Sequence, residues 1–207
     1  MLSETSETVL ILAGGFVALA LLYGLRLAVR TAMDRAVSSR PDAGDASATD
    51  GSGAHDVPGV IAPPPLMFLG FLVAATVLEA IVPLPVAGAY ALVRCLVGAA
   101  LAVCGFVMAA MGMRRFSAAG TNVPPTLPTT ALVVDGIYGR TRNPLYLGST
   151  LVYLGLSVAA GSLWAVLLVV PLLWVINVGV VAREERYLER KFGDAYRAYK
   201  ARVRRWF

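Results

Sequence analysis

The sequence contains little of what soluble enzymes use for metal binding or for a water-exposed surface. It has one histidine and two cysteines, and charged residues make up only 15% of its 207 residues. One histidine with two cysteines in a single apolar run cannot build the usual zinc or haem site, so we expect no metal. No glycine-rich loop follows an expected strand, and strands do not alternate with helices. The pattern therefore argues against a doubly wound nucleotide-binding domain.

Apolar residues are abundant, at 57% of the chain, and the mean hydropathy is +0.70. A soluble domain of this size needs more polar surface, so the composition predicts an integral membrane protein. Polar or proline-containing segments divide the apolar residues into runs long enough for helices. We therefore expect an all-α membrane bundle of about five transmembrane helices, over residues 8–29, 66–82, 88–111, 145–160 and 164–182.

The composition also predicts how the chain is divided. Residues 1–30 are expected to form the first transmembrane helix. Residues 31–63 are rich in Ser, Ala, Asp and Gly without apolar periodicity, which is typical of a flexible linker on the cytoplasmic side. Residues 64–207 form the remaining core, with an amphipathic, cytoplasmic helical segment at the C-terminus.

The basic residues follow the expected spans. The net charge of +5 could indicate a nucleic-acid partner, but the basic residues flank apolar runs, which favours a role in membrane topology. With five alternating spans, all 18 Lys and Arg except Arg94 fall on one side. The positive-inside rule then predicts an outer N-terminus and a cytoplasmic C-terminus. Glu79 and Arg94 lie within spans, and we expect them to form an ion pair near the outer surface, a place in a substrate path being the alternative.

Two polar segments flank the last two apolar runs. Residues 136–148 precede the first of these runs, and Glu184 and Glu185 follow the second. Because a helical hairpin returns to the membrane face that it left, we expect both segments to meet at the cytoplasmic surface. Arginines could there hold the carboxylate of a zwitterionic ligand, and the glutamates its ammonium or ribose hydroxyls. Salt bridging beside the membrane is the alternative interpretation.

The C-terminal segment carries an apolar stripe at helical spacing, formed by Leu188, Phe192, Tyr196, Tyr199 and Val203. Gly193 is expected to divide this helix into two. The stripe predicts an interfacial anchor, a lid over a ligand at the base of the hairpin, or both.

Several motifs in the same order resemble the isoprenylcysteine carboxyl methyltransferase and phospholipid methyltransferase superfamily. They span about the last ninety residues: Phe116-x-x-x-Gly120-Thr121, Gly136-Ile-Tyr138, Arg142-Asn-Pro-Leu-Tyr-Leu-Gly148, Glu184-Glu185 and Phe192-Gly-x-x-Tyr196-x-x-Tyr199-Lys-x-Arg202-Val203. The resemblance implies an integral membrane enzyme that transfers a methyl group from S-adenosylmethionine to a lipophilic acceptor, with membrane lipids around it.

The resemblance also implies roles for individual residues. Arg142 and Arg202 would be catalytic. Arg142 would hold the cofactor carboxylate or shape the pocket, and Arg202 would lie near the accepting group. The cofactor would lie in a cytoplasmic pocket made by the base of the hairpin and the C-terminal helices. Its binding residues would be Gly120, Thr121, Asn143, Tyr146, Gly148, Glu184 and Glu185.

Asn143 departs from the family, which often has histidine between the arginine and the proline. Asparagine cannot take up a proton near neutral pH, so a mechanism with a base at this position is in doubt. Methyl transfer can instead depend on positioning and desolvation. A phosphatidylethanolamine N-methyltransferase and a non-catalytic scaffold or transporter subunit are the alternative functions. The Arg-rich, Lys-poor composition suggests a bacterial plasma membrane.

Overall fold

The computed structural model describes residues 57–84, 90–122 and 127–206, all within one compact unit, Ala54–Phe207. The expected first span at residues 8–29 and most of the linker lie outside these residues. The described part of the chain contains helices and turns and no strand, which confirms the expected all-α class. Its elements are α2 (Pro64–Ile81), α3 (Ala91–Ala118), η2 (Gly136–Gly139), α4 (Pro144–Ala160), α5 (Leu163–Ile176), η3 (Asn177–Val181) and α6 (Ala182–Arg202).

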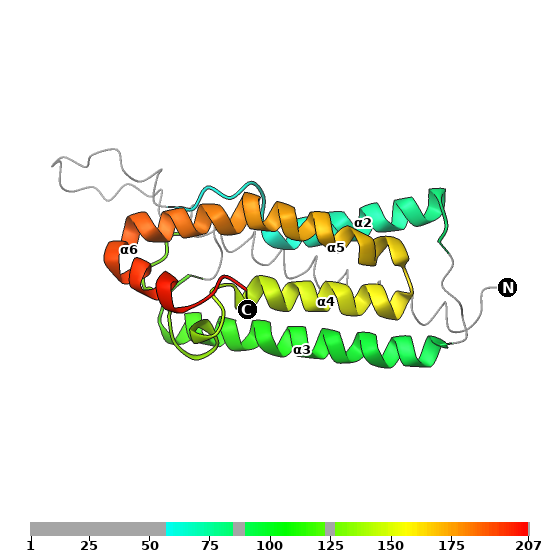
Figure 1. The fold of residues 1–207 in the computed structure, drawn as a ribbon, viewed down its shortest axis with the longest axis horizontal. Coiled ribbons are helices and arrows are strands. Elements are labelled where there is room, and N and C mark those ends of the chain that lie inside the picture. The colour runs from blue at the N-terminus through cyan, green and yellow to red at the C-terminus, as the bar shows by residue number, and fades with distance from the viewer. Residues whose placement is uncertain (1–56, 85–89, 123–126, 207) are drawn as a thin grey trace, which may run out of the picture. The chain divides into compact units, whose positions relative to one another are not determined.

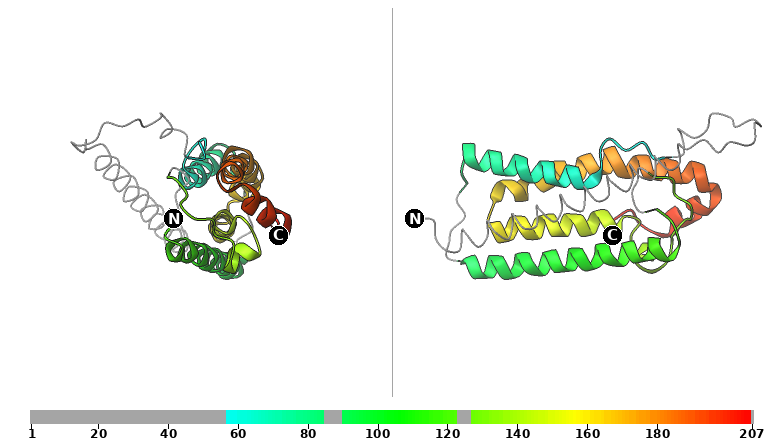
Figure 2. Two further views of the ribbon diagram at one scale, coloured as in Figure 1. Left: turned by 90° about the vertical axis from the view of Figure 1, so that its left-hand side faces the viewer. Right: turned by 180° about the vertical axis from the view of Figure 1, so that it is seen from behind.

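The apolar helices lie side by side (Figure 1). Among the described residues, three helical segments are long and apolar enough to cross a membrane: Pro64–Ile81, Ala91–Ala118 and Leu163–Arg202. The apolar part of the third is α5 with η3, and Gly193 interrupts it farther along. α4 is a shorter apolar helix. It packs between α3 and α5, and α2 packs on α5, as the end-on view in Figure 2 shows. The described part of the chain is thus a membrane-spanning helical bundle.

α3 and α4 approach closely because glycines of each helix face the backbone of the other. A Cβ atom at Gly155 would lie 2.5 Å from the carbonyl oxygen of Gly98, and one at Gly148 would lie 2.6 Å from that of Gly105. Small residues of this kind allow two helix backbones to pack closely in lipid. Close packing matters there because the hydrophobic effect does not favour helix–helix contact over helix–lipid contact. The close contact between α3 and α4 fixes the position of the N-terminal end of α4.

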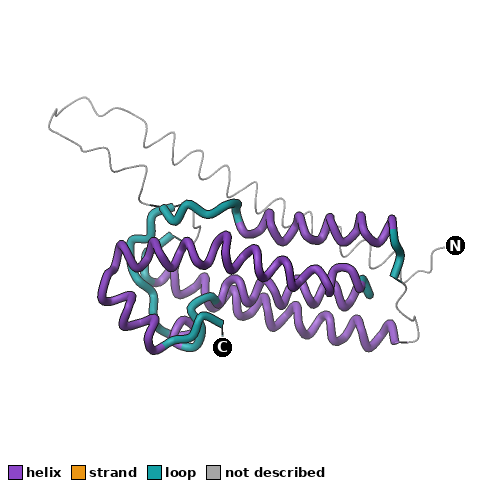
Figure 3. Tube along the Cα trace, turned by 45° about the horizontal axis from the view of Figure 1, so that its top comes forward, coloured by secondary structure: helices purple, strands orange, loops and turns teal. Residues whose placement is uncertain are grey.

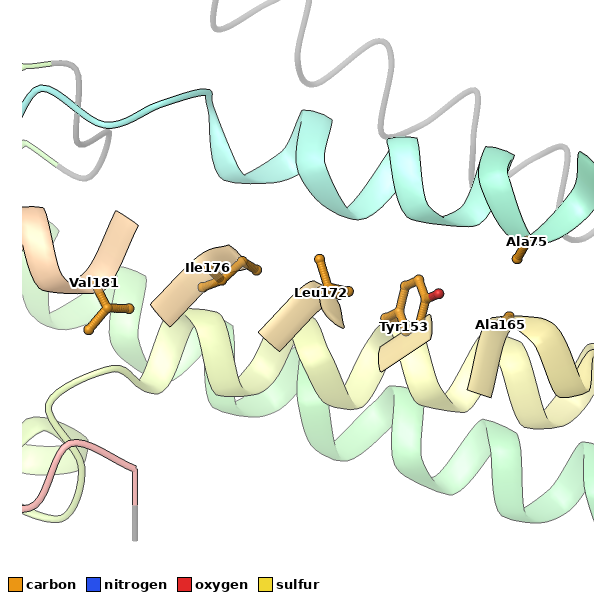
Figure 4. Packing of buried hydrophobic residues seen from close by; sticks show 6 residues of the cluster. All are labelled: Ala75, Tyr153, Ala165, Leu172, Ile176 and Val181. Carbon is orange, nitrogen blue, oxygen red and sulfur yellow. The ribbon is translucent and has the colours of Figure 1, made fainter. Parts of the chain in front are cut away.

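A second contact joins α2 to α4 and α5. Its buried members come from all three helices and from η3, and they line one seam (Figure 4): Ala75, Tyr153, Ala165, Leu172, Ile176 and Val181. Large side chains on the outward faces of α2 and α3 are exposed, as a lipid-facing surface requires.

The helix that begins with α5 continues through a π-helical turn, η3, into α6 without a break. Gly193 then reverses its direction, with a non-helical φ of 52° and ψ of −123°. This confirms the predicted division at Gly193. The amphipathic stripe is confirmed as well, because its members pack together with Leu132 and Val134.

The ends of α3 differ slightly from the prediction. α3 extends through Phe116 to Ala118, where the sequence suggested a connecting segment. Gly120 ends it, with a φ of 62°. The Gly120 and Thr121 amides donate back to the carbonyls of Ser117 and Phe116, at 3.2 and 3.1 Å. This is the glycine-dependent arrangement that closes many helices.

The predicted ion pair between Glu79 and Arg94 is wrong. Glu79 instead accepts hydrogen bonds from the Leu84 amide, at 3.1 Å, and the Ser162 hydroxyl, at 3.3 Å. The Arg94 guanidinium lies against Gly161, the residue that ends α4. The positive charge of Arg94 there faces the negative, C-terminal end of the α4 dipole. This attraction explains why Arg94 lies beside Gly161 and not beside Glu79.

Replacement of Gly155 by alanine tests the close packing of α3 and α4. We expect Gly155→Ala to destabilise the fold by about 1–3 kcal/mol, because the added methyl group overlaps the Gly98 carbonyl. Thermal unfolding in detergent measures the change. Gly70→Ala is the matched control, because a Cβ there meets nothing within 4 Å, and it should keep or slightly raise stability. Equal behaviour of the two variants would contradict the assigned packing.

Candidate functional site

Several loops gather with α6 at one end of the bundle (Figure 3). Residues from this end of the chain's helices and loops line a pocket. It is bounded by η2, the start of α4, the start of α6 and the turn of α6 beyond Gly193. Its walls are apolar in part and carry polar groups from several segments: Pro58, Phe116, Asn122, Thr129, Ala131, Leu132, Val133, Tyr138, Arg142, Asn143, Pro144, Leu145, Tyr146, Glu184, Glu185, Tyr187, Leu188, Tyr196 and Tyr199.

The start of α4 places two of these polar groups. Pro144 occupies the first turn, where its missing N–H costs nothing, and Asn143 precedes it with a buried side chain. The Asn143 amide group donates to the Arg205 carbonyl, at 3.0 Å, so the side chain joins α4 to the C-terminal segment. Tyr146 stands on the first turn of α4 and reaches α6.

Glu185 binds two arginines from opposite sides. One carboxylate oxygen accepts from Arg142 Nη2 at 2.8 Å, and the other from Arg205 Nη2 at 2.6 Å. The Glu185 and Arg142 side chains are 8% and 9% exposed, and that of Arg205 is 35% exposed. Burial by itself would raise the pKa of Glu185, but the hydrogen bonds from Arg205 and Arg142 outweigh it and lower that pKa. Glu185 is therefore ionised, and both of its carboxylate oxygens are already bonded to arginines.

The C-terminal segment completes the arrangement. The Arg142 amide donates to the Arg204 carbonyl at 3.0 Å, and its Nη1 donates to the carbonyls of Val203 and Lys200. Arg205 Nη1 also donates to Asn177 Oδ1, at 3.1 Å, in the π-helical turn. Residues that follow α6 are thus attached to the start of α4 and to the end of α5.

Glu184 has a different environment from its neighbour. Tyr146 donates its hydroxyl to one carboxylate oxygen of Glu184 at 2.6 Å. Among the described residues, the second oxygen has no hydrogen-bond partner, and the residue lines the pocket. Burial raises the pKa of Glu184 to about 7, with the Tyr146 hydrogen bond acting against this and the charge of Glu185 adding to it. Glu184 is thus the carboxylate available to a ligand.

The structure brings five of the predicted site residues to this pocket: Arg142, Asn143, Tyr146, Glu184 and Glu185. The prediction that both ends of the hairpin meet at one face is confirmed by the bond between Arg142 and Glu185. The pair forms a nearly buried salt bridge at the pocket.

The other four predicted residues do not line the pocket. Gly120 ends α3, and the Thr121 hydroxyl accepts from the Thr130 amide at 2.9 Å. Gly148 lies in the α3–α4 contact. Arg202 is exposed, and its side chain donates to the Ala198 carbonyl one turn earlier.

Sequence reasoning did not assign a role to Arg205 or to the hydroxyl of Tyr138. Arg205 is one of many basic residues near the C-terminus, and its spacing does not distinguish it from the others. Tyr138 was a candidate within the polar segment 136–148 and part of a family motif, but it had no role of its own. Asn177, in the π-helical turn, accepts a hydrogen bond from Arg205.

The Glu185 interactions can be tested by removing the charge. Glu185→Gln should lower stability by about 3–5 kcal/mol, because two arginines lose their buried anion. Thermal unfolding in detergent at pH 7 reports the loss. Asp194→Asn is the control: its pair with Arg197 is 96% and 56% exposed, and pairs so open to water contribute little to stability. A Glu185→Gln variant as stable as Asp194→Asn would disprove the structural role.

Comparison with known proteins agrees with this architecture. Residues 93–195 match the phospholipid methyltransferase family. An uncharacterised protein of Haemophilus influenzae is 48% identical over 62 residues, which are 30% of this chain and 98% of that protein. The protein-S-isoprenylcysteine O-methyltransferase of Schizosaccharomyces pombe is 38% identical over 72 residues, which are 35% of this chain and 30% of that enzyme. No solved structure matches. The chain belongs to the isoprenylcysteine carboxyl methyltransferase and phospholipid methyltransferase superfamily of integral membrane proteins.

Proposed function

We propose that this chain is an S-adenosylmethionine-dependent methyltransferase for a lipophilic acceptor, similar to the isoprenylcysteine carboxyl methyltransferases. The main support is the pocket at the end of the bundle, where one carboxylate oxygen of Glu184 has no hydrogen-bond partner within the described part of the chain and the walls are partly apolar. Family membership supplies the reaction class.

The residues around Glu184 fit the donor groups of this cofactor. S-adenosylmethionine carries ribose hydroxyls and an ammonium group, and a carboxylate can accept hydrogen bonds from either. Tyr146 holds Glu184 in place through its 2.6 Å hydrogen bond, and Asn143 presents a side-chain amide to the same pocket. We propose Glu184, Asn143 and Tyr146 as the cofactor-binding group. When bound, the cofactor would supply an electrophilic methyl group on a sulfonium.

Of the two roles that the resemblance implies for Arg142, shaping the pocket agrees better with its bonds than holding the cofactor carboxylate. Its guanidinium is bonded to Glu185 and to the carbonyls of Val203 and Lys200. A cation with these bonds is not available to a ligand carboxylate, so we propose that Arg142 holds the pocket in shape. Asn143 does not act as a base, and the protein would promote transfer through orientation and exclusion of water.

We propose that the pocket faces the cytoplasm of a bacterial cell, with the N-terminus outside. The described arginines at the ends of the spans support this orientation, because Arg114, Arg115, Arg140, Arg142 and Arg183 lie in the segments at the pocket end. Arg94 near the start of α3 is the exception. The lipophilic acceptor would reach the pocket from the surrounding lipid membrane.

A phospholipid N-methyltransferase is the second candidate, favoured by the description of the matching family. A radiolabelled transfer assay separates the two. Purified protein is given S-[methyl-³H]adenosylmethionine and either a prenylated cysteine analogue or phosphatidylethanolamine vesicles, and extracted host lipids serve as a third acceptor. Label in the first product only supports the proposed acceptor class, and label in the second supports the alternative. Failure to label any acceptor, together with failure to bind the cofactor, would favour a scaffold or transporter subunit.

The role of Glu184 predicts a pH dependence of cofactor binding. A carboxylic acid with a pKa of about 7 is mostly neutral at pH 6 and mostly ionised at pH 8. If the ionised form binds, the affinity for S-adenosylhomocysteine should fall roughly tenfold from pH 8 to pH 6. Titration calorimetry measures this, and Glu184→Gln should bind more weakly with no such slope.

Glu189→Gln is the control for this measurement. Glu189 lies on α6 but pairs with Lys200, at 3.2 Å, and does not line the pocket. It should therefore keep the pH profile of the unmodified protein. A slope that persists in Glu184→Gln would assign the titration to another group.

A further inference from the structure

One row of exposed side chains runs along α5, η3 and α6. Its members recur at steps of three or four residues, with one step of five across the π-helical turn, so they lie on one side of the helix. In chain order they are Leu163, Leu167, Val170, Trp174, Val178, Arg183, Arg186 and Arg190. The apolar members are 41–70% exposed, as side chains in contact with lipid are. The row thus changes from apolar to basic where the apolar span ends.

The apolar stripe of α6 is covered by the protein itself. Leu188 and Phe192 pack on the buried cluster beyond Gly193, together with Leu132 and Val134. This stripe is therefore already in use and does not face the membrane. α6 meets its surroundings through the exposed arginines that continue the lipid-facing row of α5.

An open groove lies where the basic part of this row reaches the turn of α6. It is lined by Arg186, Glu189, Arg190, Gly193 and Arg197. Two of the charged residues in the groove are already paired. Glu189 binds Lys200 at 3.2 Å, and Arg197 binds Asp194 at 2.6 Å. The groove therefore has no carboxylate left for its remaining two arginines.

The guanidinium groups of Arg186 and Arg190 are the ones without an anion. Among the described residues, Arg190 has no hydrogen-bond or ion-pair partner, and Arg186 donates through Nε to the Ala182 carbonyl one turn earlier. α6 extends past the start of α4 (Figure 1). Arg186 and Arg190 follow Ala182 by about 6 and 12 Å along the helix axis. Because helical side chains tilt toward the N-terminus, both lean back toward the membrane surface.

We propose that Arg186 and Arg190 bind the phosphate groups of anionic phospholipids in the leaflet at the pocket end of the bundle. Guanidinium groups match phosphate oxygens in charge and in paired hydrogen bonds. A lipid fits the whole row, because its acyl chains can lie along the apolar part on α5 while its headgroup meets the arginines. The contact would hold the part of α6 that carries Glu184 and Glu185 at the membrane surface.

Competition between two lipids tests the proposal. The full chain in detergent is mixed with equal amounts of phosphatidylglycerol and phosphatidylcholine that carry the same acyl chains, and native mass spectrometry measures the lipid retained. The unmodified protein should retain more phosphatidylglycerol than phosphatidylcholine. Arg190→Gln should lower this ratio roughly fivefold, the effect of one basic residue beside an anionic lipid surface, and Arg186→Gln should act in the same way.

Arg197→Gln is the matched control. It removes the same charge from the same groove, but Arg197 already has Asp194 as its anion and lies beyond the turn at Gly193. It should change the lipid ratio by less than about twofold. All three variants should unfold at the temperature of the unmodified protein in lipid-free detergent, because the three side chains are exposed. An equal loss in Arg197→Gln and Arg190→Gln would reduce the effect to net charge and overturn the proposal.

A soluble anion is the alternative occupant of the groove. If inorganic phosphate raises the unfolding temperature as much as phosphatidylglycerol does, and Arg190→Gln removes both effects, the arginines bind free phosphate and the lipid assignment is wrong. Equal retention of the two lipids by the unmodified protein would also overturn the proposal. These measurements use no methyl donor, so their outcome is independent of the proposed reaction.

Discussion

The carboxylate of Glu185 is the constraint on which the candidate site depends. It joins three segments that are distant in sequence: the start of α4 through Arg142, the start of α6, and the C-terminal segment through Arg205. Removing charges from water costs several kcal/mol for each ion, and the cost is recovered only when every group finds its partners. The interactions of Glu185 with Arg142 and Arg205 therefore contribute little net stability. They are satisfied only when the three segments take one relative position, and in that position the segments form the pocket.

The two adjacent glutamates have separate roles because of helix geometry. Consecutive residues on a helix do not point in the same direction, so Glu184 and Glu185 meet different surroundings. Glu185 is saturated by arginines, whereas Glu184 receives one hydrogen bond from Tyr146 and keeps an oxygen for the pocket. The lowered pKa of Glu185 and the raised pKa of Glu184 express the same difference. Two adjacent glutamates that form one acidic motif in the sequence thus differ in the structure: one is buried between arginines, and the other is bonded to Tyr146 at the pocket.

The position of the site follows from the membrane. Irregular backbone and unpaired polar groups are tolerated at the ends of a bundle, where water and protein can satisfy them, but not on a lipid-facing helix. The turns of η2, the C-terminal segment and the π-helical turn all lie at the pocket end. Close packing of α3 on α4 through glycines fixes the start of α4 relative to this end. A rigid apolar bundle therefore supports a polar site built from several loops.

The sequence by itself determined the helical class, the apolar helices within the described residues, the break at Gly193 and the meeting of Arg142 with Glu185. These depend on local patterns: apolar run length, helical spacing, and the return of a hairpin to its own membrane face. Only the tertiary structure decided that Arg205 rather than Arg202 reaches Glu185, that Glu79 does not pair with Arg94, and that Gly148 packs against α3. These choices depend on where side chains of distant segments arrive in space, and residue spacing along one chain does not contain that information.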